Sequence, residues 1–229
     1  MGGKEVNNEV VGLEKAYDIS LGSRGYRVVK RILDIIVSIP GIIATLFILL
    51  CVKVAYLLKG DKEKIIFTQK RIGLNGEEFR VYKIRTMIPN AEEYLLNVLL
   101  KEDPEIREEY LKNKKIENDP RVTKIGKILR KTSLDEFPQF INVLKGDMSV
   151  VGPRPYLPYE KDDMKECYKD IIKVKPGITG PWQVSGRNNT SFEKRILLDQ
   201  DYSKNKSIKL DIKIFFKTFG SVFAKEGAK

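Results

Sequence analysis

The stretch IIVSIPGIIATLFILLCV, residues 35–52, decides the fold class that we expect for this chain. It is a run of 18 residues without a charge, and a helix needs about 18–20 apolar residues to cross a membrane. The run follows a polar and charged N-terminal segment, so it does not have the position of a cleavable signal peptide. We therefore predict a membrane-inserted helix within residues 24–60.

Two further properties of the run indicate how this helix enters the membrane. Pro40-Gly41 lies in its interior, and a proline there removes a backbone donor and clashes with the preceding turn, so we expect a break or a kink. Lys and Arg flank the run on both sides, and such flanks favour the cytoplasmic side. A bent helix that enters and leaves the same leaflet satisfies both flanks, so we predict a re-entrant, monotopic helix. A single span and the buried core helix of a soluble domain are the alternatives.

The composition of the chain limits the kinds of catalysis that are possible for it. Its 229 residues suffice for one domain or at most two, and the net charge is +11. The sequence contains no histidine, which excludes hydrolases of the Ser-His-Asp or Cys-His type and any imidazole base. Acid–base work must therefore be done by carboxylates, Lys, Tyr or Cys.

Local patterns predict a small amount of sheet and several helices. Two β-branched and aromatic runs joined through Asn75-Gly76 predict a β-hairpin. Residues 90–117 are typical of a surface helix pair broken at Asp103-Pro104. Residues 121–131 predict an amphipathic helix with a cationic face. Residues 208–223 combine bulky apolar side chains with lysines, which suits either an interfacial helix on anionic lipid or a helix packed on the core.

The stretch RKTSLDEFP, residues 130–138, carries the candidate chemistry. One interpretation is structural: Ser133, with Glu136 three residues later, forms a capping box that starts a helix. Pro138 counts against it, because this proline would fall inside the helix, whereas proline prefers the first helical position. If Pro138 opens the helix instead, Asp135 and Glu136 lie just ahead of its positive end, among basic side chains, in a phosphate pocket.

Two carboxylates in a phosphate pocket repel an anionic substrate unless one of them binds a metal ion or attacks phosphorus. A carboxylate nucleophile that forms an acyl phosphate is established chemistry, and Mg²⁺ is a common partner of phosphate groups in proteins. From these residues alone, a helix cap, a metal ligand and a carboxylate nucleophile remain the alternatives for Asp135 and Glu136.

A series of short motifs is similar to those of a known family. In order along residues 27–220 they are KR at 30–31, QKRIG at 69–73, YKIRTM at 82–87, DPR at 119–121, RKTSLDE at 130–136, GDMS at 146–149, GPRP at 152–155 and KPGITG at 175–180. Together they resemble the bacterial sugar transferases, the monotopic polyprenyl-phosphate phosphoglycosyl transferases that prime exopolysaccharide and capsule synthesis.

The resemblance implies a two-step reaction. The carboxylate at the position of Asp135 attacks the phosphate that bears the sugar of a UDP-sugar, which releases UMP and leaves an aspartyl-phosphosugar. The lipid carrier undecaprenyl phosphate then accepts the phosphosugar. The resemblance also implies Mg²⁺ as cofactor, with Asp135 as a ligand and Glu136 as the partner carboxylate.

The resemblance further implies a set of residues that bind substrate or phosphate. Asp211, near the C-terminus, matches an acid of the family, although a surface contact on a basic helix explains it equally well. The segment with Arg195 and Asp199 looks like the galactosyl- and glucosyl-phosphate branch, so UDP-galactose or UDP-glucose is the expected donor and a UDP-N-acetylated sugar the alternative. The expected binding residues are Lys83, Arg85, Arg130, Pro153, Arg154, Pro155 and Asp211.

These expectations define a layout for the chain. It is an α+β, mainly helical protein with a mobile N-terminal arm at 1–23, a re-entrant membrane helix at 24–60, and a catalytic domain at 61–229 on the cytoplasmic face of the bacterial cell membrane. The expected partners are the UDP-sugar, undecaprenyl phosphate and membrane lipid, with downstream glycosyltransferases as further candidates. A nucleic-acid partner is disfavoured, because no known binding motif accompanies the charge. The remaining alternative is a non-enzymatic membrane adaptor.

Overall fold

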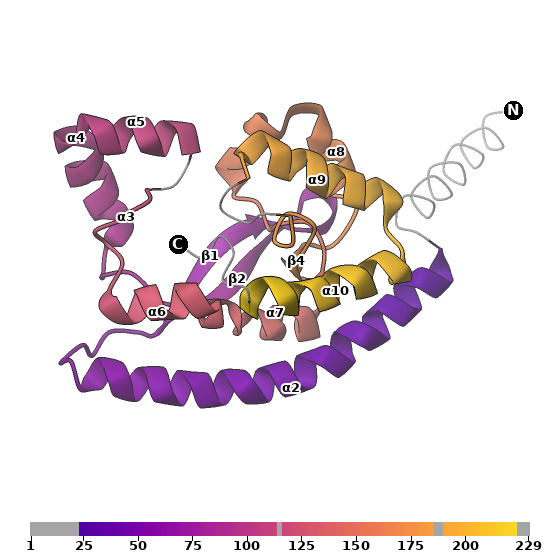
Figure 1. The fold of residues 1–229 in the computed structure, drawn as a ribbon, viewed down its shortest axis with the longest axis horizontal. Helices are drawn as coiled ribbons and strands as arrows, with labels where there is room; N and C mark the ends of the chain where they lie inside the picture. Colours follow the sequence, from indigo (N-terminus) through magenta and orange to yellow (C-terminus); the bar gives the residue numbers. More distant parts are fainter. Residues whose placement is uncertain (1–22, 114–115, 186–189, 224–229) are drawn as a thin grey trace, which may run out of the picture.

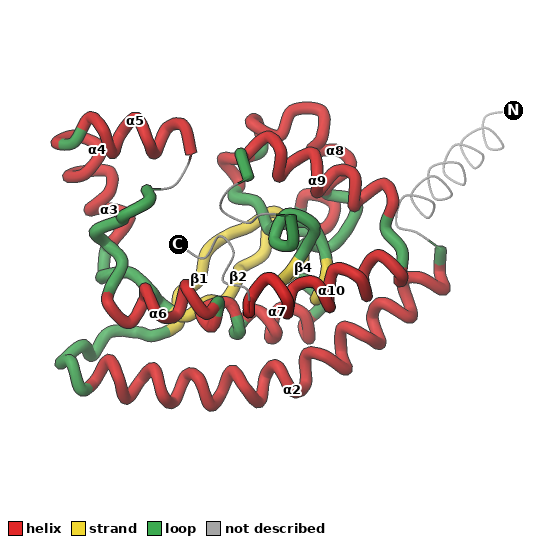
Figure 2. Tube along the Cα trace, viewed as in Figure 1, coloured by secondary structure: helices red, strands yellow, loops and turns green. Residues whose placement is uncertain are grey.

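The computed structural model describes residues 23–113, 116–185 and 190–223. A long helix, α2 (Arg24–Leu57), runs along one side of a body of shorter helices and short strands (Figure 1). The strands lie in the middle of that body, with helices around them (Figure 2). The predicted mainly helical α+β class is confirmed. The arm predicted for residues 1–23 lies, apart from Ser23, outside the described residues.

Helix α2 is continuous over 34 residues and contains Pro40. Of the break or kink expected at Pro40-Gly41, the break is therefore absent, and α2 bends partway along (Figure 1). The proline explains a bend, and so do two back-bonding hydroxyls: Ser38 Oγ donates to the Asp34 carbonyl at 2.6 Å, and Thr45 Oγ1 to the Gly41 carbonyl at 2.7 Å.

The two faces of α2 have the reverse of the usual polarity. The face against the body buries mainly small or polar side chains, namely Asp34, Ser38, Gly41, Thr45, Val52 and Tyr56. The opposite face exposes large aliphatic and aromatic side chains, of which Ile36, Ile43, Leu46, Phe47 and Leu50 are each at least 60% exposed. Only 22% of the apolar window of α2 is buried, so the buried core helix is the wrong interpretation. An apolar surface of this kind indicates contact with membrane.

Helix α2 packs closely on α7 (Gln139–Lys145). A Cβ atom at Gly41 would lie 2.5 Å from the Phe140 ring, so the glycine permits this close approach. Thr45 Oγ1 also lies 3.0 Å from the carbonyl oxygen of Phe137, the residue two before α7. The apolar helix is thereby attached to the segment that carries Asp135 and Glu136.

The predicted hairpin is confirmed. Strands β1 (Ile66–Ile72) and β2 (Glu78–Ile84) pair antiparallel, with Ile66 opposite Ile84. Asn75 and Gly76 adopt φ values of 58° and 83°, the left-handed backbone that tight hairpin turns require.

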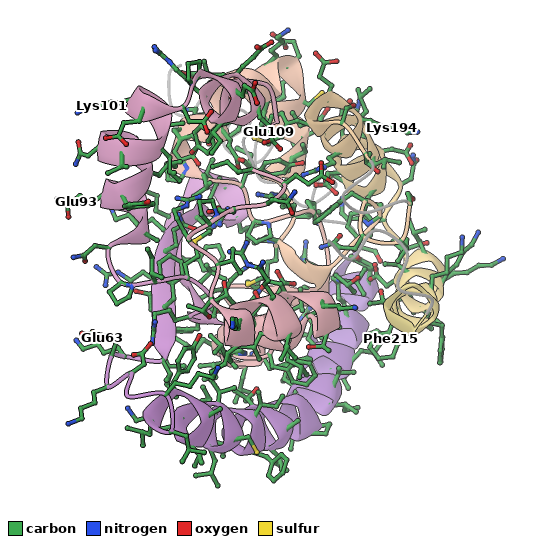
Figure 3. All side chains as sticks on the ribbon, turned by 60° about the vertical axis from the view of Figure 1, so that its left-hand side comes forward. Glu63, Glu93, Lys101, Glu109, Lys194 and Phe215 are labelled. Atoms are coloured by element: carbon green, nitrogen blue, oxygen red, sulfur yellow. The ribbon has the colours of Figure 1, made fainter. Side chains whose placement is uncertain are left out.

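The other helices follow the predicted pattern. The helix pair at residues 90–117 is interrupted where expected, because α4 ends at Glu102 and α5 starts at Pro104. The predicted cationic helix is α6 (Lys124–Thr132). In the helix pair, the side chains of Glu93 and Lys101 point away from the body (Figure 3). The bounds are α3 (Ala91–Tyr94), a π-helical turn (Leu95–Leu99), α4 (Leu100–Glu102), α5 (Pro104–Asn113), α6 (Lys124–Thr132), α8 (Tyr168–Ile171), α9 (Phe192–Asn205) and α10 (Ile208–Phe223).

A second, parallel pair of strands sets the position of the GPRP loop. Strand β3 (Ser149–Val151) pairs with β4 (Gly177–Thr179), and the Gly152 N–H donates to the Thr179 carbonyl at 2.9 Å. A Cβ atom at Gly152 would overlap the backbone of the segment that leads into β4. This glycine therefore lets the two backbones touch, and the Pro153-Arg154-Pro155 loop starts at a fixed point.

Helix α10 packs on the core through Ile214, with Leu210 and Phe215 beside it, which confirms the core-packed interpretation for one face. Ile212 and Phe216 remain exposed on this helix, so an interfacial role for its outer face stays a prediction.

Candidate active site

Asp135 and Glu136 lie on a single turn between two helices. Ser133, with φ 57°, ends α6 in the left-handed conformation, and its N–H caps the last carbonyls of that helix. Leu134–Glu136 then forms one 3₁₀ turn, and α7 begins directly after Pro138. The capping-box interpretation is therefore wrong, because Ser133 terminates a helix and its side chain caps none. The prediction that Pro138 opens the helix is confirmed.

Glu136 is held by a lysine of the hairpin. Lys83, on β2, places Nζ 2.8 Å from Glu136 Oε1. Burial by itself would raise the pKa of Glu136, but the charge and hydrogen bond of Lys83, assisted by Arg154 and Arg71, outweigh it and hold the pKa below its usual value. Glu136 is therefore an ionised carboxylate with a fixed partner.

Asp135 has a different environment although it is the adjacent residue. Burial, followed by the charge of Glu136, raises the pKa of Asp135 to about 6, while Lys83 and Arg130 act in the opposite direction. Within the described part of the chain, Asp135 has no ion pair and no hydrogen bond with another side chain. Its carboxylate is thus available to attack an electrophile or to bind a cation.

Arg130 reaches the same turn from the last turn of α6. Its Nε donates to Thr86 Oγ1 at 3.0 Å, and its charge favours the ionised form of Asp135. Helix α6 can approach this closely because Gly126 lies against the backbone of Thr86, where any Cβ atom would overlap. The structure therefore brings the predicted residues Lys83 and Arg130 to the carboxylate pair.

Arg154 belongs to the Pro153-Arg154-Pro155 loop, and its positive charge helps to lower the pKa of Glu136. Its Nη2 lies 3.8 Å from Glu160 Oε1, and its guanidinium carbon lies 5.8 Å from the centroid of the Trp182 ring. Its Nε is buried without a hydrogen-bond partner among the described residues. Such a donor is suited to an anionic ligand.

Sequence reasoning missed several neighbours of Arg154. Arg71 donates from Nη1 to the Pro155 carbonyl at 3.1 Å, and burial, with the charge of Arg154, lowers its pKa to about 10. Arg195, on α9, has its guanidinium carbon 5.2 Å from the Trp182 ring centroid. The QKRIG motif already contained Arg71, but nothing in the sequence indicated that it approaches the GPRP loop.

Two predicted site residues make their contacts away from the turn that carries Asp135 and Glu136. Arg85 Nη2 donates to both carboxylate oxygens of Asp61, at 2.9 and 2.8 Å, and the guanidinium lies over the Tyr56 ring at the end of α2. Asp211 is buried and accepts hydrogen bonds from Lys30 and Tyr202. The surface contact considered for Asp211 is therefore wrong, because the residue is 5% exposed. Substrate binding by these two residues remains a prediction.

The carboxylate pair meets the ligand requirement of one kind of metal. The described residues contain no group of three Asp, Glu, His or Cys side chains placed to hold an ion. Magnesium, however, usually binds through one or two carboxylates and completes its shell with water and substrate phosphate. Asp135, which has no ion pair or side-chain hydrogen bond in the described part of the chain, fits such a ligand.

Sequence comparisons identify relatives over nearly the whole chain. A Haemophilus influenzae protein named "Uncharacterized sugar transferase" is 44% identical over 91% of this chain and 44% of its own length. The "Undecaprenyl-phosphate galactose phosphotransferase" of Salmonella typhimurium is 42% identical over 91% of this chain and 43% of its own length. The "Exopolysaccharide production protein ExoY" of Sinorhizobium fredii is 38% identical over 87% of both chains.

The chain thus spans less than half the length of the first two of these relatives, and most of the length of the third. The model of the family described as "Bacterial sugar transferase" matches residues 25–225. These residues include α2, the carboxylate pair and the GPRP loop. The match confirms the resemblance carried by the motifs, and the chain belongs to the bacterial sugar transferase family.

Proposed function

We propose that this chain transfers a sugar phosphate from a UDP-sugar to undecaprenyl phosphate, with release of UMP, as the first step of surface-polysaccharide synthesis. One observation carries the proposal: among the described residues Asp135 has no ion pair and no side-chain hydrogen bond, and it stands beside a Glu136 that is already paired with Lys83. Adjacent carboxylates whose environments shift their pKa values in opposite directions are suited to different roles.

In the first step an Asp135 carboxylate oxygen attacks the phosphorus that bears the sugar. A new oxygen–phosphorus bond forms, the bond from that phosphorus to the bridging oxygen breaks, and UMP leaves with the electron pair. Arg130 and Lys83 offset the charge near the attacked phosphate, and Arg154 contributes a further positive charge that acts on Glu136. Positioning and charge neutralisation of this kind account for most of the catalysis in phosphoryl transfer.

In the second step a phosphate oxygen of undecaprenyl phosphate attacks the same phosphorus. The bond to Asp135 breaks, the carboxylate is regenerated, and the product is a lipid-linked diphosphosugar. Glu136 keeps Lys83 in place through both steps. When bound, Mg²⁺ would add positive charge at the phosphates, and Asp135 is the side chain that we assign to hold it.

The donor that we propose is UDP-galactose or UDP-glucose. Galactose is the sugar in the name of the Salmonella typhimurium relative, and the segment with Arg195 and Asp199 suggested the same branch. A UDP-N-acetylated sugar is the second candidate, and the assay below separates the two.

We also propose that α2 inserts from the cytoplasmic face as a re-entrant helix. Its exposed apolar face and its attachment to the segment before α7 support this arrangement, since a lipid acceptor requires the carboxylates near the headgroups. The test replaces Cys51 and Cys167 by serine and introduces Arg24→Cys or Lys59→Cys. A membrane-impermeant maleimide should label both positions from the cytoplasmic side only. Labelling from opposite sides would establish a single span and overturn the re-entrant arrangement.

The function is tested by UMP release from the full chain in nanodiscs, with Mg²⁺, undecaprenyl phosphate and a panel of UDP-sugars. Wild type should release UMP with one donor. Asp135→Asn should lower the rate by about 10³-fold or more, because an amide cannot act as the nucleophile. The matched control is Asp162→Asn, an exposed aspartate outside the site, which should retain the wild-type rate.

Each result of this assay has a distinct meaning. Turnover that persists in Asp135→Asn would exclude the aspartyl-phosphosugar mechanism. Silence of the wild type with every donor, in a folded and membrane-bound protein, would favour the adaptor over the enzyme.

A further inference from the structure

Asp199 is a buried carboxylate that the proposed reaction does not use. It lies in the middle of α9 and is 0% exposed. Its Oδ2 accepts hydrogen bonds from the Arg154 backbone N–H at 3.0 Å and from the Tyr156 hydroxyl at 2.8 Å. Its Oδ1 has no hydrogen-bond partner among the described residues. Burial of a carboxylate costs free energy, so the contacts of Asp199 must offset this cost.

The contact with Arg154 is special because of the two prolines. Neither Pro153 nor Pro155 has an N–H group, so the Arg154 amide is the only backbone donor in the Pro153-Arg154-Pro155 loop. That donor is bonded to Asp199. The carboxylate therefore holds the one amide through which this loop can be fixed from α9.

Tyr156, by contrast, has other anchors. It is 2% exposed and belongs to an apolar cluster with Ile72, Met164, Ile171 and Ile196. Its carbonyl also accepts the Ile72 N–H at 2.8 Å. The contact that only Asp199 provides is thus the contact with Arg154.

Helix α9 also supports the side chain of Arg154. Arg195 lies one turn before Asp199 on α9, and the guanidinium groups of Arg195 and Arg154 both lie within 6 Å of the Trp182 ring centroid. Aromatic–guanidinium contacts of this kind stabilise a cation in one orientation. The helix therefore contacts the backbone of Arg154 directly and its side chain through Trp182.

We propose that Asp199 is a positioning residue, which fixes the Arg154 backbone so that the guanidinium keeps its place beside Glu160 and Trp182 during transfer. This inference rests on the proposed function for its kinetic consequences. It does not rest on that function for the loop geometry, which can be measured without turnover.

The kinetic test compares variants of the full chain in nanodiscs by UMP release. Asp199→Ala should lower kcat/KM by about 10²-fold, the loss that a displacement of about 1 Å can cause. Asp199→Asn should restore most of this loss, because its amide oxygen can accept the same two hydrogen bonds. Asp201→Asn, a substitution of an exposed residue on the same helix, is the matched control and should retain wild-type kinetics.

A double-mutant cycle separates positioning from a general structural role. If Asp199 acts through Arg154, Asp199→Ala should have almost no further effect in an Arg154→Ala background. Equal losses in both backgrounds would overturn the proposal, and so would an Asp199→Asn variant as slow as Asp199→Ala. Should Asp199→Ala fail to fold, Asp199→Ser takes its place, because a serine hydroxyl is too short to reach both donors.

Trp182 provides a readout that needs no activity. It is the only tryptophan of the chain, and it lies against both guanidinium groups. Asp199→Ala should shift its emission and increase its quenching by acrylamide, whereas Asp199→Asn and Asp201→Asn should leave both unchanged. An unchanged signal in Asp199→Ala would show that the loop does not depend on Asp199. A changed signal in a chain whose wild type releases no UMP would support the loop contact and refute only the transferase function.

Discussion

Two charged clusters of this molecule differ in how many hydrogen-bond and ion-pair partners their carboxylates have. At the junction of α2, β3 and α10, Asp34 Oδ1 accepts from Ser149 Oγ at 2.9 Å and from the Val150 N–H at 2.8 Å. Asp211 accepts from Tyr202 at 2.6 Å through Oδ1 and from Lys30 at 2.8 Å through Oδ2. At the turn before α7, in contrast, Asp135 has no such side-chain partner among the described residues.

The difference separates carboxylates that hold elements of the fold together from carboxylates that are available to a ligand. A buried carboxylate that is hydrogen-bonded and paired can attach one element to another, and removal of either partner is costly. A carboxylate left without a partner, among cations, is available to a ligand. The junction therefore holds the membrane-facing helix to the sheet, and the turn before α7 is where a phosphate would be expected.

The largest expected effect is a loss of stability at the junction. Asp211→Ala removes the acceptor of Lys30 and Tyr202 and leaves a partly buried ammonium unpaired, so the free energy of unfolding should fall by about 3 kcal/mol. Chemical unfolding in detergent measures this change. The donor kcat/KM per folded molecule, measured on the same variant, distinguishes a structural Asp211 from a substrate-binding one.

The opposite outcome would remove the distinction between the junction around Asp211 and the turn that carries Asp135. If Asp211→Ala unfolded like wild type but lost transfer activity, Asp211 would belong to the substrate-binding set that the motifs implied. Asp162→Ala, on an exposed turn, controls for the loss of one negative charge.

The second prediction concerns the pair that fixes Glu136. Lys83→Met should lower kcat/KM by about 10²-fold, because a preorganised cation is lost from the phosphate site, whereas Lys83→Arg should recover part of the rate. The matched control is Lys70→Met, which removes an exposed lysine from the other strand of the hairpin, where it pairs with Glu78. Equal rates for Lys83→Met and Lys70→Met would show that Lys83 has a structural role and does not contribute to transfer.

The smallest expected effect is a pH dependence of stability that arises from Asp199. Burial raises the pKa of Asp199 to about 7, although Arg154, Tyr156 and Arg195 act in the opposite direction. An unfolded aspartate titrates near pH 3.9, so the native state binds the proton more tightly and this contribution to stability falls as pH rises between about 4 and 7. From pH 6 to 7 the loss should be about 1 kcal/mol.

Thermal unfolding at a series of pH values measures this loss. The Tm of wild type should fall by about 2–4 °C between pH 6 and 7 as a result of Asp199. Asp199→Asn should remove this part of the slope, because the amide does not titrate. The same slope in both proteins would assign the pH dependence to another group.

Local signals in the sequence were sufficient for many elements. The turn at Asn75-Gly76 and the interruption at Asp103-Pro104 both appear where their residues predict them. The decision between Ser133 and Pro138 as the start of a helix was also local, since proline at an interior position would break the ladder. Signals of this kind depend on a few neighbouring residues and need no knowledge of the remaining chain.

The sequence by itself determined the apolar helix, the hairpin, the family motifs and the adjacent carboxylates Asp135 and Glu136. Only the tertiary structure decided that α2 turns its polar face inward, that Asp211 is buried against Lys30, and that Asp199 holds Arg154. These contacts join residues that are 45 to 181 positions apart. Periodicity and spacing report on a few turns of chain at a time, so they cannot tell which distant side chain will satisfy a buried charge.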